Sequence, residues 1–106
     1  MAVYVDDFKA SYRGMKMCHM LADTDEELHQ MADKIGVNRK WWQSPDKTSG
    51  SHYDICLSKR KIAIEMGAVE ITVKQMAAMN HYRRHHGSLC LPSEAIRLYR
   101  ERLKAQ

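Results

Sequence analysis

A histidine and an aspartate stand two positions apart in the middle of the chain, at His52 and Asp54. If this segment is extended, both side chains lie on the same side of it, because alternate residues of a strand share a face. An imidazole beside a carboxylate can act as a general base with its orienting acid. The same two groups can also supply nitrogen and oxygen ligands to a metal ion.

Two earlier polar residues extend this candidate site. Asp6 follows an expected strand over residues 3–5, and His19 lies in a second apolar run over residues 17–22. If the two strands are neighbours in a sheet, the acid at one strand end can meet the histidine of the other. The candidate catalytic residues are therefore His19, His52 and Asp54. The candidate ligands for a divalent metal such as Zn, Mn or non-haem Fe are Asp6, His19, His52 and Asp54.

A structural interpretation of the same residues stays open. Asp6 can cap a turn, His19 can be a hydrogen-bonded core residue, and Asp54 can cap a helix. No close signature such as HExxH, and no glycine-rich phosphate loop, decides between the two interpretations. The sequence therefore leaves open whether a metal is bound and whether the protein is an enzyme.

Two cations lie in the first turn of an expected helix over residues 59–66, at Lys59 and Arg60. Positive charge there opposes the helix dipole, which favours anions at an N-terminus. A phosphate group bound between the helix amides and these two side chains would account for the placement. The alternative is that both side chains turn outward and form ion pairs, each contributing less than about 1 kcal/mol.

Two adjacent tryptophans, Trp41 and Trp42, are expected in a third strand with Gln43. Their rings then point to opposite faces, so that one can be in the core while the other lies near the surface. An exposed ring can stack on a nucleic-acid base, and Trp42 is the candidate for this role. The alternative is packing beneath the polar loop over residues 44–51.

The net positive charge is concentrated in the last quarter of the chain. Residues 81–106 contain six Lys or Arg and two Glu, whereas residues 1–80 contain eleven basic and eleven acidic residues. A segment of this kind attracts polyanions, although a solvated helix face is the common alternative. Arg83 and Arg84 are the candidate ligand-binding residues within it.

A last helix is expected to begin at Pro92, with a thin apolar face formed by Ile96, Tyr99 and Leu103. This face could also bind a protein partner. We therefore divide the chain into an α/β domain over residues 1–80 and a basic helical extension over residues 81–106. Because both capping boxes lie before residue 81, we expect the first part to fold without the second.

The order of elements predicts an α/β fold in which helices cover a small parallel or mixed sheet of three to four strands. The clearest helix spans residues 25–35, because Thr24 and Glu27 form a capping box before it and Gly36 follows it. A second capping box, Thr72 to Gln75, opens a helix that extends to about residue 84. Residues 8–16 lack a period and are expected to be a loop, and residues 69–71 a strand.

Cysteine usage and hydropathy bear on the cellular compartment. Cys18, Cys56 and Cys90 form no close pair, and no basic region followed by an apolar stretch opens the chain. We therefore expect reduced thiols in a cytoplasmic protein. No apolar run approaches the roughly 18 residues of a membrane span, so no membrane partner is expected. The sequence does not indicate an oligomeric state.

Several short segments, in this order, resemble an uncharacterised bacterial and phage family called domain of unknown function 4031. The segments are Val-Tyr-Val-Asp-Asp, Met-Cys-His-Met-Leu-Ala-Asp-Thr-Asp-Glu-Glu-Leu-His, Trp-Trp-Gln, His-Tyr-Asp, Lys-Arg and Gly-Ala-Val-Glu-Ile. The resemblance covers residues 3–76 and implies a small cytoplasmic domain with no established activity. The family motif falls on Asp6, Asp7, His19, Asp23, Glu27, Leu28, His29, His52, Tyr53 and Asp54.

Three functions are compatible with these observations. The leading hypothesis is a domain that binds a phosphate-bearing ligand, either a nucleotide or a nucleic acid, at a site shaped by His52, Asp54, Lys59 and Arg60. The first alternative is a phosphoester hydrolase that uses the His/Asp cluster with or without a divalent metal. The second alternative is a phage-type accessory protein that acts by protein–protein interaction through residues 81–106.

Overall fold

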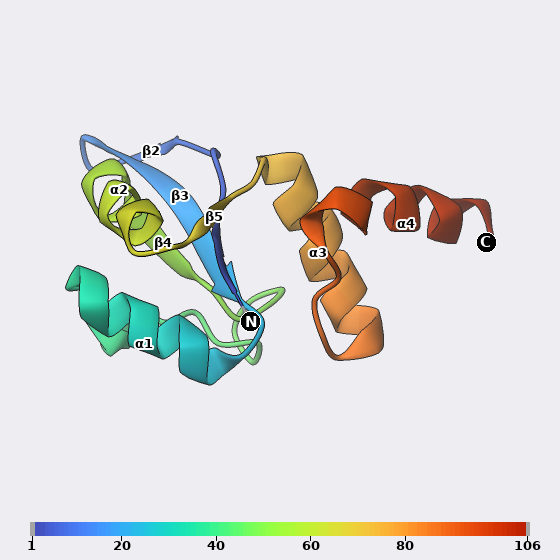
Figure 1. The fold of residues 1–106 in the computed structure, drawn as a ribbon, viewed down its shortest axis with the longest axis horizontal. Coiled ribbons are helices and arrows are strands. Elements are labelled where there is room, and N and C mark those ends of the chain that lie inside the picture. Colours follow the sequence, from blue (N-terminus) through green and yellow to red (C-terminus); the bar gives the residue numbers. More distant parts are fainter. Residues whose placement is uncertain (1, 106) are drawn as a thin grey trace.

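The computed structural model describes residues 2–105 and confirms the predicted α/β class. Figure 1 shows a twisted sheet with helices on both sides. The strands are β1 (Val3–Val5), β2 (Ala10–Tyr12), β3 (Met15–Ala22), β4 (Tyr53–Cys56) and β5 (Val69–Glu70). The helices are α1 (Asp25–Ile35), α2 (Leu57–Glu65), α3 (Val73–His86) and α4 (Pro92–Lys104), with a 3₁₀ turn η1 at Arg39–Trp41.

The sheet is mixed and is organised around the long strand β3. Antiparallel β4 pairs with one side of β3, while β2 and then β1 pair with successive parts of its other side. Strand β5 adds to β1 in parallel. In the β3–β4 ladder His19 is directly opposite Asp54, which places two of the predicted site residues side by side.

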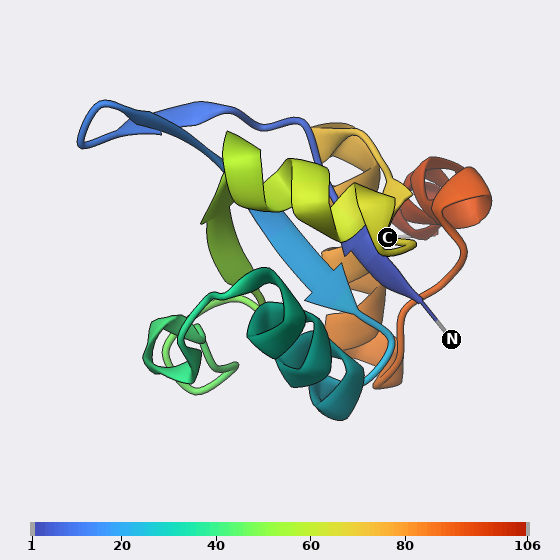
Figure 2. The same cartoon turned by 60° about the vertical axis from the view of Figure 1, so that its left-hand side comes forward.

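Two hydrophobic cores, one on each face of the sheet, hold the helices in place (Figure 2). Helices α1 and α2 pack on one face, where Leu28 and Ala63 contact strand residues such as Met20. Helices α3 and α4 pack on the other face, where Met79 and Ala95 meet the side chains of β1 and β3. The helical period that predicted α1 is confirmed, because its buried residues are Leu28, Met31, Ala32 and Ile35.

The expected loop over residues 8–16 is instead a β-hairpin, so the sheet has five strands rather than three or four. Tyr12 pairs with Met15 across a two-residue turn at Arg13 and Gly14, whose φ angles are 49° and 78°. Positive φ at both positions is the type I′ geometry that matches the twist of a hairpin. The turn was missed because arginine is not a usual residue for its first position.

The expected strand at Trp41–Gln43 is also wrong. Asn38 accepts a hydrogen bond from the Lys40 amide at 2.9 Å, and this cap begins the 3₁₀ turn that contains Trp41. Only Gln43 reaches the sheet, through an isolated antiparallel bridge to His52. The bridge ties the end of the polar loop to the start of β4.

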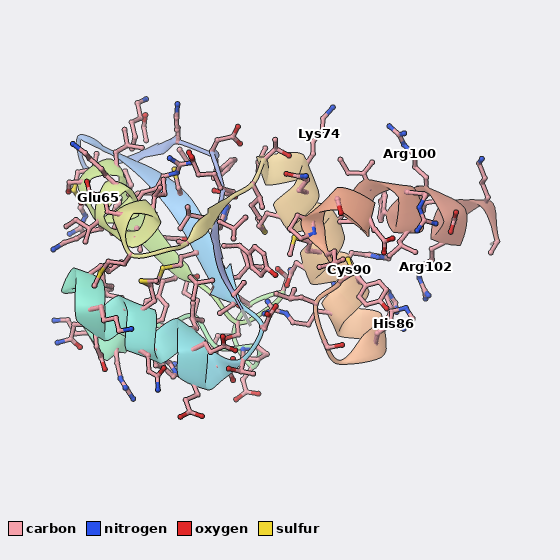
Figure 3. The ribbon with its side chains drawn as sticks, viewed as in Figure 1. Glu65, Lys74, His86, Cys90, Arg100 and Arg102 are labelled. Atoms are coloured by element: carbon pink, nitrogen blue, oxygen red, sulfur yellow. The ribbon has the colours of Figure 1, made fainter. Side chains whose placement is uncertain are left out.

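The proposed division at residue 80 falls inside α3, which the predicted Thr72–Gln75 capping box does open. Ala95 of α4 is only 1% exposed, so this helix supplies part of the second core. On the outer surface of the helical pair, Arg100 extends into solvent while Arg102 approaches His85 of α3 (Figure 3). No helix within residues 2–105 is both long and apolar enough to cross a membrane.

Candidate metal centre

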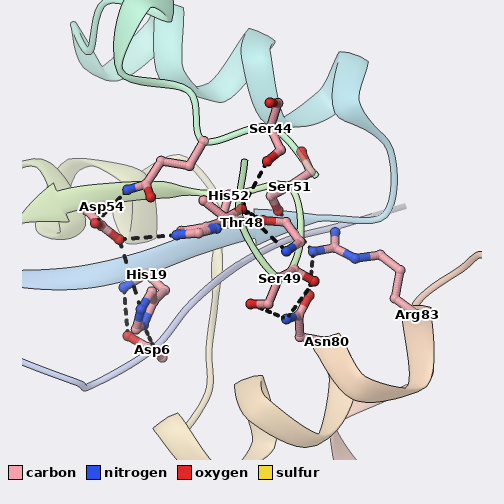
Figure 4. Close-up of polar contacts among 12 residues, drawn as sticks. Asp6, His19, Ser44, Thr48, Ser49, Ser51, His52, Asp54, Asn80 and Arg83 are labelled. Atoms are coloured by element: carbon pink, nitrogen blue, oxygen red, sulfur yellow. Dashed lines mark hydrogen bonds and ion pairs between the residues drawn. The ribbon is translucent and has the colours of Figure 1, made fainter. Parts of the chain in front are cut away.

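Three predicted side chains converge at the β3–β4 ladder: His19, His52 and Asp54 (Figure 4). One ligand atom from each lies within 4.8 Å of the other two. The Asp54 Oδ1 atom is 3.5 Å from His52 Nε2 and 3.9 Å from His19 Nε2. The cluster therefore brings two imidazole nitrogens and one carboxylate oxygen together at a single point.

The imidazole of His19 is oriented by the buried carboxylate of Asp6. His19 Nδ1 donates to Asp6 Oδ2 at 2.7 Å, and the His19 amide donates to Asp6 Oδ1 at 2.8 Å. The Phe8 amide also donates to Asp6 Oδ1, at 3.2 Å. The Asp6 carboxylate is thus fixed by backbone donors and in turn fixes the His19 ring with its proton on Nδ1.

The imidazole of His52 is oriented by the backbone of the preceding loop. Its Nδ1 donates to the Gly50 carbonyl at 2.7 Å. Gly50 is buried against α3, and a Cβ atom at this position would clash with the Asn80 side-chain amide. Arg83 holds the same loop by donating to the Ser51 carbonyl at 3.0 Å. Helix α3 therefore sets the loop position that aims His52.

The carboxylate of Asp54 is the most accessible member of the cluster. Gln43 Nε2 donates to Asp54 Oδ2 at 2.6 Å, which leaves Oδ1 facing the two histidines. The Asp54 side chain is 42% exposed, whereas those of His19 and His52 are 20% and 17% exposed. A water molecule or substrate can therefore reach the cluster from the Asp54 side.

The direction of the two histidine lone pairs is the most informative property of the cluster. A neutral imidazole donates from one nitrogen and accepts at the other. Because both Nδ1 atoms donate to fixed oxygens, both Nε2 atoms present lone pairs toward the Asp54 carboxylate. Three acceptors facing one another repel unless a proton or a cation lies between them.

The spacing fits a first-row divalent metal. Zinc binds histidine nitrogen and carboxylate oxygen at about 2.0–2.2 Å, so tetrahedral ligand atoms are about 3.3 Å apart. The histidine–carboxylate separations are 3.5 Å and 3.9 Å, and all three ligand atoms lie within 4.8 Å of one another, so the side chains would have to move closer together to bind one ion. Metal-binding histidines usually donate their other ring N–H to a carboxylate or a backbone carbonyl, and Asp6 and Gly50 supply such acceptors here.

The interaction between Asp54 and His52 favours the charged form of each side chain. Hydrogen bonding to His52 is the main factor that lowers the pKa of Asp54, against the opposing effect of burial. Burial tends to lower the pKa of His52, but hydrogen bonds to Asp54 and to the Gly50 carbonyl raise it overall. A proton and a metal ion thus compete for the same His52 lone pair.

Other predicted site residues lie away from the cluster or have structural contacts. Asp6 lies behind His19, where it accepts a hydrogen bond from Nδ1, and it is not one of the three side chains that converge. Lys59 and Arg60 do not form one site. Lys59 lies near Gly36 at the end of α1 and lines a groove beside Asp54. Arg60 points elsewhere and donates to the Asp6 carbonyl at 2.8 Å.

The tryptophan chosen from the sequence is the less accessible of the pair. Trp42 packs edge-on against His29 and donates from Nε1 to Ser51 Oγ at 2.8 Å. Its neighbour Trp41 is 59% exposed and lines the groove beside the cluster. Arg83 lies near His52 and supports the loop, whereas Arg84 is exposed on α3.

Sequence reasoning missed the residues that position the cluster and line its groove. Gln43 and Gly50 act on Asp54 and His52 through contacts that no local pattern encodes. Phe8 stacks on His19 with ring centroids 4.9 Å apart. Its position directly after the Asp6–Asp7 pair was the one available signal, because it places a large aromatic residue beside a candidate site residue.

The fold and the cluster together define a mixed α/β domain with a two-histidine, one-carboxylate site at one end of its central ladder. A family model described as "Protein of unknown function (DUF4031)" matches residues 3–83. The chain belongs to this family, as its sequence segments had indicated. Neither the curated proteins nor the solved structures contain a match to it.

Proposed function

We propose that this protein is a divalent-metal-dependent phosphoester hydrolase whose metal is held by His19, His52 and Asp54. The observation that supports it is the inward direction of both Nε2 atoms toward Asp54 Oδ1. Both rings are held in that orientation by hydrogen bonds at Nδ1, to Asp6 and to the Gly50 carbonyl. A set of this kind with one exposed side is typical of catalytic rather than structural metal sites.

A divalent metal bound here would supply a water molecule that ionises near neutral pH and would polarise a phosphoryl oxygen. In hydrolysis the water oxygen attacks phosphorus, the P–O bond to the alcohol breaks, and the proton from water is transferred to the alcohol oxygen. The protein side chains orient the ligands and keep the Asp54 side accessible to the substrate. No other carboxylate lines the groove beside the cluster within residues 2–105.

A phosphate group is the favoured substrate because cations flank the cluster. Lys59 lines the same groove as His19 and Asp54 and has no ion-pair partner among the described residues. Arg83 lies with His19 and His52 around a small cavity of about 50 Å³ on the α3 side. Its guanidinium already donates to the Ser51 carbonyl and the Asn80 side chain, so Lys59 is the cation left for a phosphate. The hypothesis of a phosphate held between Lys59 and Arg60 receives less support, because the Arg60 guanidinium donates to the Asp6 carbonyl.

Metal content and phosphodiesterase activity test the proposal. Untagged protein should contain, or take up from Zn or Mn solutions, one metal ion per chain and should then hydrolyse bis(p-nitrophenyl) phosphate. The His52→Ala and Asp54→Asn variants should lose both properties. His86→Ala is the matched control, because His86 is exposed at the end of α3 and outside the cluster.

Two results would contradict the proposal. One is the absence of stoichiometric metal together with an unchanged melting temperature in excess Zn or Mn, since a ligand bound only by the native state must stabilise it. The other is metal binding at the cluster without hydrolysis of phosphodiesters or phosphomonoesters. This second outcome would retain the metal site and reject the reaction.

A further inference from the structure

An open groove with a volume of about 780 Å³ begins at the candidate metal centre. Three parts of the chain line it: the β2–β3 hairpin, the segment from Gly36 to Trp41, and the junction of β4 and α2. His19 and Asp54 are among the lining residues, so a ligand that fills the groove would also contact two side chains of the candidate metal centre. The groove therefore determines which part of a substrate can lie beside the cluster.

Exposed aromatic rings are the main apolar feature of this groove. Phe8, Tyr12 and Trp41 are 50%, 51% and 59% exposed, and all three line the groove. They come from two separate segments, and Phe8 adjoins the cluster because its ring stacks on His19. Large exposed rings collected around a groove indicate a binding surface rather than a core.

The charged residues around the groove are almost entirely basic. Residues 8–17 contain Lys9, Arg13 and Lys16 and no acid, and residues 36–42 contain Arg39 and Lys40 and no acid. Lys40 and Lys59 line the groove itself, and Lys40 Nζ lies 5.1 Å from the Trp41 ring centroid. Within residues 2–105 the only carboxylate that lines the groove is that of Asp54, which belongs to the candidate metal centre.

We infer that the groove binds single-stranded nucleic acid, with bases stacked on Phe8, Tyr12 and Trp41 and phosphates near Lys40 and Lys59. Aromatic rings alternating with cations are the usual surface for unpaired strands, because every base has a face that can stack. A duplex keeps those faces inside its helix and cannot use the rings. The inference rests on the proposed function in one respect, because it places a backbone phosphate of the strand at the cluster. The substrate class of the hydrolase would then be single-stranded nucleic acid.

Binding measurements without metal test the groove separately from catalysis. Fluorescence anisotropy in EDTA compares a labelled oligothymidylate with a duplex of equal length, and the single strand should bind more tightly. Trp41→Ala and Tyr12→Ala should each weaken binding roughly 5- to 150-fold, the effect of one lost base stack. Tyr99→Ala is the control, because Tyr99 is a partly exposed aromatic residue on α4, away from the groove.

The salt dependence identifies the phosphate contacts. Lys40→Ala and Lys59→Ala should each reduce the slope of log K against log salt by about 0.7, the value for one phosphate on a single strand. Arg100→Ala on α4 should leave the slope of groove binding unchanged. Equal binding of the single strand and the duplex would overturn the inference. It would also be overturned if Arg84→Ala or Arg100→Ala weakened oligothymidylate binding while the groove variants did not.

The outcomes distinguish this inference from the proposed function. One outcome is that the protein binds single strands through Trp41 and Tyr12 but takes up no metal. That result would support the groove as a nucleic-acid site and contradict the proposed hydrolase activity. Hydrolysis of bis(p-nitrophenyl) phosphate by a metal-loaded protein that does not bind oligothymidylate would retain the hydrolase and reject the groove assignment. An apolar or peptide substrate would then be the remaining class for the groove.

Discussion

The imidazole rings of His19 and His52 meet edge to face with their centroids 5.4 Å apart, and each ring donates its Nδ1 proton away from the other. His19 lies in β3 whereas His52 directly precedes β4, and their outer hydrogen bonds go to different kinds of acceptor. One acceptor is the Asp6 carboxylate and the other is the Gly50 carbonyl. The orientation of the pair thus depends on residues that are not themselves in the cluster.

Asp6→Asn should weaken Zn binding by about 10- to 100-fold, the usual effect of losing an outer-shell partner. The asparagine oxygen can keep the backbone bonds, so that its NH₂ group faces His19 Nδ1. The Nε2 atom then carries the proton and no longer has a lone pair for the metal. Isothermal titration calorimetry with Zn measures the change.

Asp7→Asn is the matched control for this experiment. Asp7 accepts a hydrogen bond from the Val73 amide at the start of α3, at 2.8 Å, and does not touch the cluster. This variant should therefore retain the wild-type affinity for Zn. Similar Zn affinities for the Asp6→Asn and wild-type proteins would mean that Asp6 has no influence on the site.

Gly50→Ala should destabilise the protein by about 1–3 kcal/mol, the usual effect of overpacking, and should weaken Zn binding. An added Cβ would clash with Asn80 and come within 2.7 Å of the Arg83 guanidinium. The loop must then move, and its carbonyl no longer aims His52. Urea denaturation and Zn titration measure the two effects.

The double variant Gly50→Ala/Asn80→Ala tests the cause. Removing the Asn80 side chain relieves the most severe of the clashes, so the double variant should be less destabilised than the sum of the two single variants. Strict additivity would show that the Gly50 effect arises elsewhere.

Arg60→Ala should destabilise the fold by about 1–3 kcal/mol, because it leaves a buried acceptor without its charged donor. The Arg60 side chain is 15% exposed and joins α2 to the end of β1 through the Asp6 carbonyl. Lys61→Ala, an exposed neighbour, should have little effect. An unchanged urea midpoint with lost binding of inorganic phosphate would instead support the anion site predicted from the helix start.

Removing α4 should destabilise the domain, contrary to the expectation that the first part folds without the last quarter. A chain ending at residue 88 loses Ala95, which is packed in the same core as Met79 and Tyr4. The urea midpoint of this chain should fall. Ala95→Asp should have a similar effect because it places a charge in that core, whereas Ala105→Asp at the exposed end of α4 should not. A stable truncated chain would show that α4 contributes little.

Cys56 should react with iodoacetamide before the other two cysteines. A hydrogen bond with Ser58, 3.2 Å from the sulfur, is the main factor that lowers the pKa of the Cys56 thiol, and amides at the start of α2 act in the same direction. Burial raises the pKa of the Cys90 thiol, and Cys18 is buried in the sheet. Peptide mapping by mass spectrometry identifies the modified site.

The pH profile of this reaction has a defined direction. Because the thiolate is the reacting form, a lowered pKa moves the rise in rate to lower pH, and Ser58→Ala should move it back upward. Cys56 also lines the groove, so bound oligothymidylate should slow its alkylation. Faster reaction at Cys90 would contradict the prediction.

Local sequence signals predicted those parts of the fold that depend on local interactions. The Thr72–Gln75 capping box and the period of Leu28, Met31 and Ile35 correctly located two helices, because caps and amphipathic faces are set within a few residues. The hairpin and the 3₁₀ turn were missed because a positive φ at Arg13 and a cap from Asn38 have weak sequence signatures.

The candidate site was predicted in composition but not in arrangement. His19, His52 and Asp54 were identified by residue type and expected strand position, and strand register then brought them together. The contribution of Gly50 depends on the approach of α3, which is distant in sequence. Which of Trp41 and Trp42 has the exposed ring depends on the 3₁₀ turn at Arg39–Trp41. The sequence did not predict this turn, so it did not identify the exposed ring.

Among the strands of residues 2–105, β4 pairs with β3 alone and forms an edge of the sheet, and the cross-strand pair His19–Asp54 lies in that ladder. An ion shared by the two side chains would clamp the edge of the sheet and suppress its fraying. Amide hydrogen exchange at Ile55 and Cys56 would then slow when metal is added. By the same linkage, each opening of this edge would separate the ligands, so the local stability of a four-residue strand would set an upper limit on how long the protein keeps its metal.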